Sequence, residues 1–486
     1  MSKQFEKRNI SMVMDFYEMT MSNGYFQHHS EDEWAVFDVF YRNNPDGAGF
    51  AICAGLEQVI EYIENLHFDK EDIEYLRSQN LFEESFLKYL EDYHFKGDIY
   101  ALPEGTIMYP GEPILTVKAP LIDAQLIETA VLLQINHQSL IATKTNRIVQ
   151  SAAGKPVSDF GARRAHNVDA AVYGARAAYI GGAVGTATVL AGQMFNIPIS
   201  GTMAHSWVMF YDSEFEAFKK YAETYPDSTV LLVDTYNVLQ SGVPNAIRIA
   251  KEVLEPQGKR LKGIRIDSGD LAYLSVEARK MLDEAGLEDC IIVASNSLDE
   301  YLIRSLNMQG AQLGSYGVGE RLITASPNPV FGGVYKLAAC SKDGKNFTPK
   351  IKVSETPEKV TNPGLKRIYR VYDQAGKAIA DFITLADEEI DFTKPVKYID
   401  PKEYWRDRTY INCTFKELQV PIFKAGKCVY TCPPLKEIRD YVRKQLDTEI
   451  WKEEQRFENP HVHFMDMSEK MYNTKVKLLE EGRRGE

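Results

Sequence analysis

Hydrophobic residues recur at helix-like spacing in some parts of the chain and at strand-like spacing in others. The changes in this pattern divide the chain into three parts. In the first third, Leu56, Val59, Ile60 and Ile63 recur at the spacing of an amphipathic helix, and a longer apolar-faced helix is predicted over residues 122–152. Residues 106–120 instead have the pattern of two short strands around a Pro-Gly turn. These patterns predict a mixed α/β segment over residues 1–150.

From about residue 156 to residue 335, short apolar runs alternate with helical segments, as in repeated βα units. The expected strands end at polar residues, among them Asp159, Asp234, Asp267 and Ser295. A barrel and a doubly wound sheet both fit this alternation. Because a barrel keeps its active site at the carboxyl ends of its strands, we favour an α/β fold with an irregular or incomplete (β/α) barrel over residues 151–340.

The last part of the chain, residues 341–486, returns to strand-like sequence. "GVYKLAAC" and "KRIYRVYDQAGKAIADFITL" predict strands, and residues 435–457 predict a charged helix. We expect these later strands to pair with the early ones. The result is an α/β domain built from N- and C-terminal segments of the chain.

Composition narrows the class of protein. The chain has 486 residues, 44% of them hydrophobic and 26% charged, which is typical of a globular protein. A net charge of −13 argues against partners such as nucleic acid or an anionic membrane. The N-terminus has no apolar core of a signal peptide, and no apolar run is long enough for a membrane helix. We therefore expect a cytoplasmic protein.

The six cysteines do not form the dense pattern of a secreted disulfide framework. Cys413, Cys428 and Cys432 are the one loose cluster. Metal binding by this cluster stays open, but structural thiols are the favoured interpretation because no second close pair accompanies it.

Two basic stretches are candidates for chemistry. "DFGARRAH" places Arg163 and Arg164 after a Phe-Gly pair, and arginine binds carboxylate or phosphate through two parallel hydrogen bonds. A surface arginine pair explains the same text equally well. "GTMAHS" places His205 after a glycine and a threonine, where it could be an acid, a base, a nucleophile or a packed structural residue.

Acidic residues follow two neighbouring predicted strands. Asp234, Asp267 and Asp270 could hold Mg²⁺ through oxygen atoms, although Asp270 could also be only a helix N-cap. Arg265 and Asp267 face the same way along one strand because side chains alternate. A charged pair on a buried strand needs polar partners, which favours a polar site there.

A glycine cluster ends the barrel segment. Gly314, Gly317 and Gly319 lie in "GSYGVGERLIT", where backbone N–H groups could approach a phosphate closely. Their spacing is neither that of a Walker loop nor that of the dinucleotide fingerprint, and the motifs HExxH and GxSxG are absent. We expect one active site to contain the arginines, the histidine, the carboxylates and this loop.

Several motifs in order now allow a comparison with known families. "MDFYEMTMSNGYF", "FDVFYRNNP", "EGTIMYPGEPILTVKAPLIDAQLIET", "DFGARRAH", "GTMAHS", "IRIDSGDL" and "GGVYKL" resemble the nicotinate phosphoribosyltransferase family over most of the chain. The resemblance implies a type II phosphoribosyltransferase fold. It also implies that nicotinate and 5-phosphoribosyl 1-diphosphate give nicotinate mononucleotide and diphosphate, a step of NAD salvage.

The resemblance further implies coupling to ATP hydrolysis through a phosphorylated histidine, which here is His205. Family dimers complete each active site across the interface with an N-terminal tyrosine, and Tyr17 matches it. We therefore expect a homodimer with shared active sites.

Under this resemblance the candidate residues take specific roles. Asp234 and Asp267 are expected to hold Mg²⁺ or the ribose hydroxyls, and Arg265 with Thr202 to orient the carboxylate or the phosphates. Which of Arg163 and Arg265 contacts carboxylate and which contacts phosphate stays open. Phe160 and Tyr17 are expected to contact the flat ring of the base. The residues expected to bind the phosphate group are Asp270, Gly317, Gly319 and Thr324.

One position bears on the choice of substrate. The related nicotinamide enzymes carry an aspartate in "GTDT", whereas this chain has "GTAT" with Ala187, and the serine usual in the nicotinate family is absent too. Loss of the acid removes repulsion against a carboxylate, so nicotinate is preferred. The alternatives are a nicotinamide enzyme on the same fold, the shorter quinolinate phosphoribosyltransferases, and a non-catalytic binding protein that retains the barrel.

Overall fold

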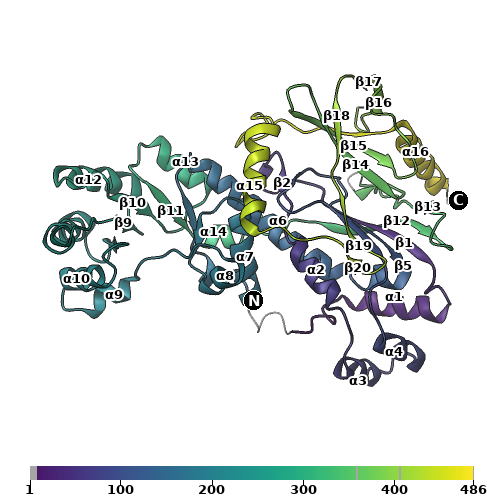
Figure 1. Cartoon of the computed structure of the whole chain (residues 1–486), viewed down its shortest axis with the longest axis horizontal. Coiled ribbons are helices and arrows are strands. Elements are labelled where there is room, and N and C mark those ends of the chain that lie inside the picture. The colour runs from purple at the N-terminus through teal and green to yellow at the C-terminus, as the bar shows by residue number, and fades with distance from the viewer. Residues whose placement is uncertain (1–7, 357–358, 404, 406, 485–486) are drawn as a thin grey trace. The chain divides into compact units, whose positions relative to one another are not determined.

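The structure is a computed structural model that describes residues 8–356, 359–403, 405 and 407–484. Residues 1–7, which belong to the N-terminal stretch discussed above, lie outside the described residues. The chain divides into two compact units, one of Met1–Leu140 with Val330–Glu486 and one of Ile141–Pro329. In Figure 1 the first unit combines purple and yellow-green segments from the two ends of the chain, and the second unit is blue to green.

The second unit is organised around a six-stranded parallel sheet with the order β7-β6-β11-β10-β9-β8. Its strands are β6 (Val157–Asp159), β7 (Gly185–Thr186), β8 (Val230–Leu232), β9 (Gly263–Ile266), β10 (Ile291–Ala294) and β11 (Ser315–Val318). The curled sheet stays open between β7 and β8, so it forms half a barrel (Figure 1). The expectation of an incomplete barrel is confirmed in this form.

Helices connect these strands. They are α7 (Val168–Ile180), α8 (Val189–Phe195), α9 (His205–Phe210), α10 (Glu214–Thr224), α11 (Val243–Ile249), α12 (Leu271–Glu284), α13 (Glu300–Met308) and α14 (Glu320–Ile323). Side chains of the preceding loops cap several of them: Asp270 accepts from Tyr273 N in α12, and Asp299 accepts from Leu302 N in α13. Such N-caps satisfy N–H groups that have no partner inside the helix.

Five of the expected strands are present, but one edge of the sheet differs from the expectation. The apolar stretch around Ile199 makes only an isolated parallel bridge to Thr186. That bridge extends β7, a two-residue strand without an apolar run in the sequence. A Cβ atom on Gly185 would lie 2.6 Å from the carbonyl oxygen of Pro198, so the close approach of the two segments depends on glycine.

In the first unit, the two ends of the chain share a seven-stranded sheet with the order β13-β12-β1-β5-β3-β19-β20. Pairing of β1 with β12 and of β3 with β19 joins early strands to late ones, as expected. The strands are β1 (Trp34–Phe40), β3 (Asp98–Ala101), β5 (Leu115–Pro120), β12 (Val334–Ser341), β13 (Thr348–Pro349), β19 (Val420–Lys424) and β20 (Lys427–Cys428).

A second, six-stranded sheet in this unit has the order β17-β16-β21-β15-β14-β18 and uses C-terminal segments alone. Its strands are β14 (Lys366–Tyr372), β15 (Ala378–Leu385), β16 (Val396–Ile399), β17 (Asp407–Tyr410), β18 (Thr414–Glu417) and β21 (Met465–Met467). The expectation that β14 and β15 pair with early strands is wrong. They form an antiparallel hairpin around Asp373–Lys377, because a short turn brings adjacent strands together at little entropic cost.

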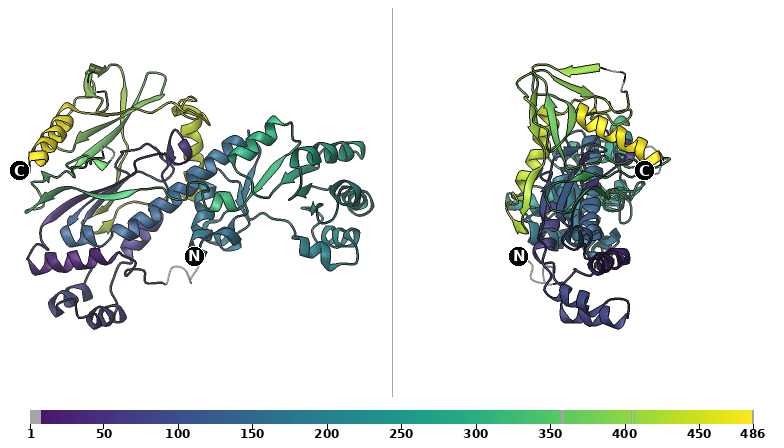
Figure 2. Two further views of the ribbon diagram at one scale, coloured as in Figure 1. Left: turned by 180° about the vertical axis from the view of Figure 1, so that it is seen from behind. Right: turned by 90° about the vertical axis from the view of Figure 1, so that its right-hand side faces the viewer.

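Helices complete the first unit. They are α1 (Phe16–Gln27), α2 (Leu56–Glu64), α3 (Lys70–Ser78), α4 (Glu84–Glu91), α5 (Leu121–Gln125), the start of α6 (Glu128–Ser151), α15 (Leu435–Lys444) and α16 (Glu469–Arg484). A separate strand pair is formed by β2 (Ala51–Ile52) and β4 (Ile107–Met108). The final helix, α16, packs on β15 and β16 and is the yellow helix in both views of Figure 2.

Two predicted helices are shorter than expected. The helix predicted over residues 122–152 is broken at Leu126–Ile127, where Glu18 of α1 accepts a hydrogen bond from Thr129 N at the start of α6. The helix predicted over 435–457 ends with a wider π turn at Gln445–Glu449. There the buried Gln445 amide donates to Gly105 O and accepts from Ile107 N. In both places a tertiary contact determines the helix end.

Among the helices of the described residues, none is both long and apolar enough to cross a membrane. Cys413, Cys428 and Cys432 are partly buried.

Candidate active site

Polar residues gather where the parallel strands of the second unit end. Asp159 ends β6 and Thr186 ends β7, while Asp234, Asp267 and Ser295 follow β8, β9 and β10 within two residues. Carboxyl ends of parallel strands lie along one edge of a sheet, so these side chains come together. The candidate site therefore lies where ligands bind in open α/β sheets.

Arg265, in β9, is the centre of the hydrogen-bond network. Its guanidinium donates to Ser295 Oγ at 2.7 Å, to Thr202 Oγ1 at 3.1 Å and to Asp267 Oδ1 at 2.7 Å. The arginine side chain is 13% exposed, whereas its neighbours Ile264 and Ile266 are fully buried. The expected alternation along β9 thus places the charged side chain in the site and the apolar ones in the core.

The two aspartates expected to hold a cation are adjacent. Asp234 Oδ2 accepts from Asp267 N at 3.0 Å and from Ser268 Oγ at 2.6 Å. Its other oxygen, Oδ1, is buried and lacks a hydrogen-bond partner among the described residues. A buried carboxylate oxygen without a donor is costly, and a cation or a ligand hydroxyl would satisfy it.

His205 begins α9 beside this pair. Its Nδ1 lies 3.1 Å from Thr235 Oγ1, and its Nε2 lies 4.0 Å from Asp267 Oδ2. The side chain is 41% exposed, so Nε2 is accessible to a ligand while the threonine orients the ring. His205 is therefore an accessible side chain and not a packed structural residue.

Phe160 follows β6 and covers one wall of the site. Its ring centroid lies 5.6 Å from Arg265 Cζ, a cation–π distance. The ring lies on Gly317 of β11, where an added Cβ would be 2.3 Å from Phe160 Cε2. Below it, the buried Asp159 accepts from Thr186 Oγ1 at 2.7 Å and from Gly161 N at 2.8 Å. Burial raises the Asp159 pKa, although both hydrogen bonds lower it.

The structure does not join every expected site residue to this network. Arg163 is exposed in the short helix Ala162–Arg164 and forms no hydrogen bond or ion pair with the described residues. Asp270 is an N-cap, the role left open above. Gly319 precedes α14, and the Thr324 hydroxyl donates to Glu320 O at 2.8 Å. Gly317 lies inside β11 rather than in a loop.

Tyr17 belongs to α1 in the first unit. It is 43% exposed, and burial of its hydroxyl raises its pKa, with further contributions from the charge of Glu128 and from a hydrogen bond to it. The next residue, Glu18, is fully buried, and burial raises its pKa to about 7. A tyrosine that is held by a carboxylate and still exposed is available to contact a ligand or another chain.

No motif in the sequence assigned a role to Thr235, Ser268 or Ser295, which contact His205, Asp234 and Arg265 respectively. Only their position in the sequence could have identified them, because each lies within a few residues of the carboxyl end of a strand. Small hydroxyl residues are so common in loops that position becomes informative only when the strands are known.

The donor set fits Mg²⁺ in the manner typical of phosphate-binding sites. No group of three or more His, Cys, Asp or Glu side chains suited to a metal occurs in the described part of the chain. Magnesium is usually held by one or two carboxylates together with substrate phosphates and water. The unpaired Asp234 Oδ1 and the neighbouring Asp267 meet that requirement.

Three family models match the chain in sequence. They describe the nicotinate phosphoribosyltransferase N-terminal domain over residues 12–136, the nicotinate phosphoribosyltransferase family over 156–380, and the C-terminal domain over 365–475. Together they span most of the described residues of both units.

Whole-chain comparisons agree with these models. The chain is 44% identical to a nicotinate phosphoribosyltransferase of Bacillus subtilis, covering 98% of this chain and 96% of the relative. It is 39% identical to one of Mycobacterium tuberculosis, covering 90% and 87%. The crystal structure of human nicotinic acid phosphoribosyltransferase superposes with a TM-score of 0.84 at 26% identity, covering 96% of this chain and 99% of the human one. The chain therefore belongs to the nicotinate phosphoribosyltransferase family.

Proposed function

We propose that this protein joins nicotinate to 5-phosphoribosyl 1-diphosphate, giving nicotinate mononucleotide and diphosphate in NAD salvage, and that ATP hydrolysis drives the reaction through phosphorylated His205. The observation that carries the proposal is the network in which Arg265 holds Thr202, Asp267 and Ser295 beside His205. It combines a cationic group for anionic substrates, carboxylates for a cation and an accessible nucleophile in one site.

In the transfer step, the pyridine nitrogen of nicotinate forms a bond to ribose C1 while the bond from C1 to the diphosphate oxygen breaks. The electron pair of that bond leaves with the diphosphate. Positive charge develops on the sugar, so orientation of the two substrates matters more than covalent catalysis. Asp267 and Asp234 supply negative charge beside the ribose.

Mg²⁺ held by Asp234 and Asp267 would neutralise the negative charge of the leaving diphosphate. The Asp234 carboxylate is fixed for this role by two donors to its Oδ2, which leaves Oδ1 free. Asp267 is fixed in turn by Arg265 and Ser295. Neither carboxylate would have to reorient in order to bind Mg²⁺.

The ATP-coupled step uses the tautomer in which His205 carries its proton on Nδ1, 3.1 Å from Thr235 Oγ1, and the lone pair of Nε2 is available. Nε2 attacks the γ-phosphorus of ATP, and the electron pair of the broken P–O bond leaves with ADP. Water later hydrolyses the phosphohistidine to phosphate and restores the free imidazole.

The site favours a planar carboxylate as the base. Arg265 supplies positive charge under the ring of Phe160, and an aromatic acid can lie against that ring. Ala187 is exposed at the end of β7, and its N–H donates to Asp159 O at 2.8 Å. An aspartate there would repel a carboxylate, so its absence favours nicotinate over nicotinamide.

The finer assignments are part of the same proposal. Arg163 contacts carboxylate or phosphate, and the phosphate group binds beside Asp270, Gly319 and Thr324. The middle segment carries the chemistry between N- and C-terminal segments divided near residues 150 and 340. The protein acts as a homodimer in which Tyr17 of one chain completes the site of its partner.

A direct assay tests the substrate. The protein is incubated with 5-phosphoribosyl 1-diphosphate, Mg²⁺ and either nicotinate or nicotinamide, and the mononucleotide product is measured with and without ATP. We expect faster turnover of nicotinate, and a further gain with ATP. Equal or faster turnover of nicotinamide would contradict the choice of substrate, and no turnover of either base would favour a non-catalytic binding protein.

A labelling experiment tests the histidine. With γ-labelled ATP we expect acid-labile phosphate on the wild-type chain and none on His205→Asn, which keeps a similar shape without an imidazole. Label that persists on the variant would exclude His205 as the phosphorylated residue.

A further inference from the structure

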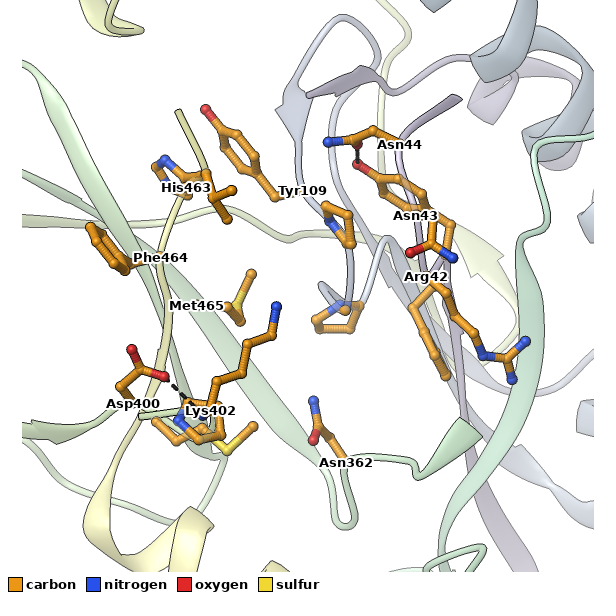
Figure 3. Close-up of a pocket in the computed structure, with 18 of the residues that line it drawn as sticks. Arg42, Asn43, Asn44, Tyr109, Asn362, Asp400, Lys402, His463, Phe464 and Met465 are labelled. Carbon is orange, nitrogen blue, oxygen red and sulfur yellow. Dashed lines mark hydrogen bonds between the residues drawn. The ribbon is translucent and has the colours of Figure 1, made fainter. Parts of the chain in front are cut away.

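A cavity of about 880 Å³ lies in the first unit, apart from the residues used in the proposed reaction. Its walls come from the end of β1 and the loop after it, the turn after β4, the start of β14, the loop after β16, the residues around β21, and α16. Figure 3 shows side chains from these segments around one space. Its volume is within the range of about 300–1,000 Å³ typical of ligand pockets.

One of the family-like motifs lines this cavity without a role in the proposed reaction. "FDVFYRNNP", residues 37–45, contributes Asp38, Tyr41 and Asn44, among others. The Tyr41 hydroxyl is held between Asn44 Oδ1 and Met108 O, each at 2.8 Å. The motif therefore forms a rigid wall of the cavity.

Two lysines at one end of the cavity differ in how their charge is balanced. Lys366 Nζ is 2.6 Å from Asp38 Oδ2 and also donates to Asn362 O and Gly364 O, so its three N–H groups are used. Lys475 Nζ donates to Asn362 Oδ1 at 2.8 Å and has no carboxylate partner in the described part of the chain. A partly buried ammonium without a counter-ion favours the binding of an anion.

Two further observations agree with an anion in this cavity. Burial and, to a lesser extent, the positive charge of Lys366 together lower the pKa of Lys475 to about 8, as expected for an ammonium that has no compensating negative charge among the described residues. Lys402, in the loop after β16, extends into the cavity in Figure 3 and forms no ion pair with the described residues. Two lysines that have no carboxylate partner among the described residues suit a group with two negative charges, such as a phosphate monoester.

One wall of the cavity contains a stacked pair of rings. Tyr109 stacks on His463 with ring centroids 3.7 Å apart and an angle of 5° between the rings. Tyr109 donates to Glu454 Oε2 at 2.5 Å, and His463 Nδ1 lies 3.2 Å from Glu454 Oε1. Phe464 and Met465 lie beside them in Figure 3. Rigid aromatic and apolar walls with a few polar groups are typical of sites that bind a ring.

We propose that this cavity binds a small molecule with a flat ring and a phosphate monoester, of the class of a nucleoside monophosphate. The phosphate binds to Lys475 and Lys402, and the ring lies against the partly exposed Phe464 and Met465. Because none of the residues assigned to the proposed reaction lines this cavity, this site is distinct from the one proposed for catalysis.

Binding of AMP to the full-length protein tests the proposal by isothermal titration. We expect a class of sites that Lys475→Gln weakens about tenfold or more, since charge-assisted hydrogen bonds are lost. Lys477→Gln is the matched control, because Lys477 is exposed on the same helix and pairs with Glu481. The same sites should remain in Arg265→Ala, which alters only the second unit. An unchanged isotherm in Lys475→Gln, or loss of these sites in Arg265→Ala instead, would overturn the proposal.

A second variant and two partial ligands complete the test. Lys402→Ala changes an exposed loop side chain and should weaken AMP several-fold without affecting thermal stability. Adenosine lacks the phosphate, and inorganic phosphate lacks the ring, so both should bind at least tenfold more weakly than AMP. Equal binding of inorganic phosphate and AMP would overturn the role of the aromatic wall, and equal binding of adenosine and AMP would overturn the role of the lysines.

Discussion

At the scale of single residues, the hydroxyl of Thr235 orients the side chain on which the proposed ATP coupling depends. Thr235 Oγ1 is the partner of His205 Nδ1 at 3.1 Å, and this contact fixes the orientation of the imidazole ring. The threonine does not need to touch the substrates to have this effect. It is a positioning residue for the histidine.

We expect Thr235→Val to slow phosphohistidine formation about 10- to 100-fold, because the imidazole loses its orienting bond while side-chain volume is kept. The KM for nicotinate should change little. Thr235→Ser, which retains a hydroxyl, should recover most of the rate. The measurement is the rate of acid-labile labelling from γ-labelled ATP, and a wild-type rate in the valine variant would contradict the role.

At the scale of elements, close packing of β11 on the residue after β6 places the wall of the site. Gly317 of β11 leaves room for the Phe160 ring, which in turn faces Arg265. Gly317 therefore allows neighbouring segments to pack closely. Its sequence context had instead predicted a loop that binds phosphate.

Gly317→Ala is expected to lower the free energy of unfolding by about 1–3 kcal/mol, because the new methyl group overlaps the Phe160 ring. Denaturant unfolding measures the loss. In the Gly317→Ala chain, Phe160→Ala should lower the free energy of unfolding by less than it does in the wild-type chain, because the two changes affect the same contact. Gly24→Ala, where an added Cβ meets nothing within 4 Å, is the control. Full additivity of the two changes would contradict the packing argument.

A second contact between elements, from α1 to α6, makes stability depend on pH. Glu18 is buried, its Oε1 accepts from Asp15 N and Thr129 N, and burial raises its pKa from 4.5 to about 7. Between these two values the folded chain retains a proton that the unfolded chain releases. This contribution to stability is complete below pH 4.5 and is lost as the pH rises through about 7.

Thermal unfolding between pH 5 and pH 8 should therefore show a smaller loss of stability in Glu18→Gln than in the wild type. The difference between the two chains is at most about 3 kcal/mol. Asp123 and Asp466, whose pKa values burial raises to about 6, act in the same direction in both chains and so do not affect the difference. Glu74→Gln, at an exposed position of α3, is the control. Parallel pH profiles for wild type and Glu18→Gln would contradict the assignment.

At the scale of the whole molecule, the proposed residues are divided between two units. Tyr17 belongs to the first unit, and His205 with Arg265 belongs to the second. A homodimer that shares its active sites would let one chain supply the tyrosine and the other supply the histidine.

Mixed dimers of two inactive variants test this arrangement. We expect Tyr17→Ala and His205→Ala to be nearly inactive alone, and co-expression of both to restore about a quarter of wild-type activity. The reason is that half of randomly paired dimers are hybrids with one complete site. If each site used its own chain's tyrosine, every site in the mixture would lack one group, and activity would stay near that of the single variants.

The predictable part of the fold and site follows from local patterns. The barrel strands were predictable because apolar runs end at polar residues, and Arg265 with Asp267 was predictable because side chains alternate along a strand. The two-residue strand β7 was missed because its pairing depends on the Ile199 bridge and not on its own composition. The break between α5 and α6 was missed because Glu18, more than a hundred residues earlier, supplies the hydrogen bond at Thr129.

The sequence by itself determined the family, the alternation of strands and helices and the identity of the candidate groups, because these depend on residues near one another in the chain or on motifs as a whole. Only the tertiary structure decided which of them meet: Thr235 with His205, Ser295 with Arg265, and Phe160 with Gly317. It also decided that Asp270 caps a helix and that one oxygen of Asp234 has no hydrogen-bond partner among the described residues. The physical reason is that hydrogen bonds and packing join atoms by distance in space, and pairs separated by 30 to more than 150 residues leave no local pattern to read.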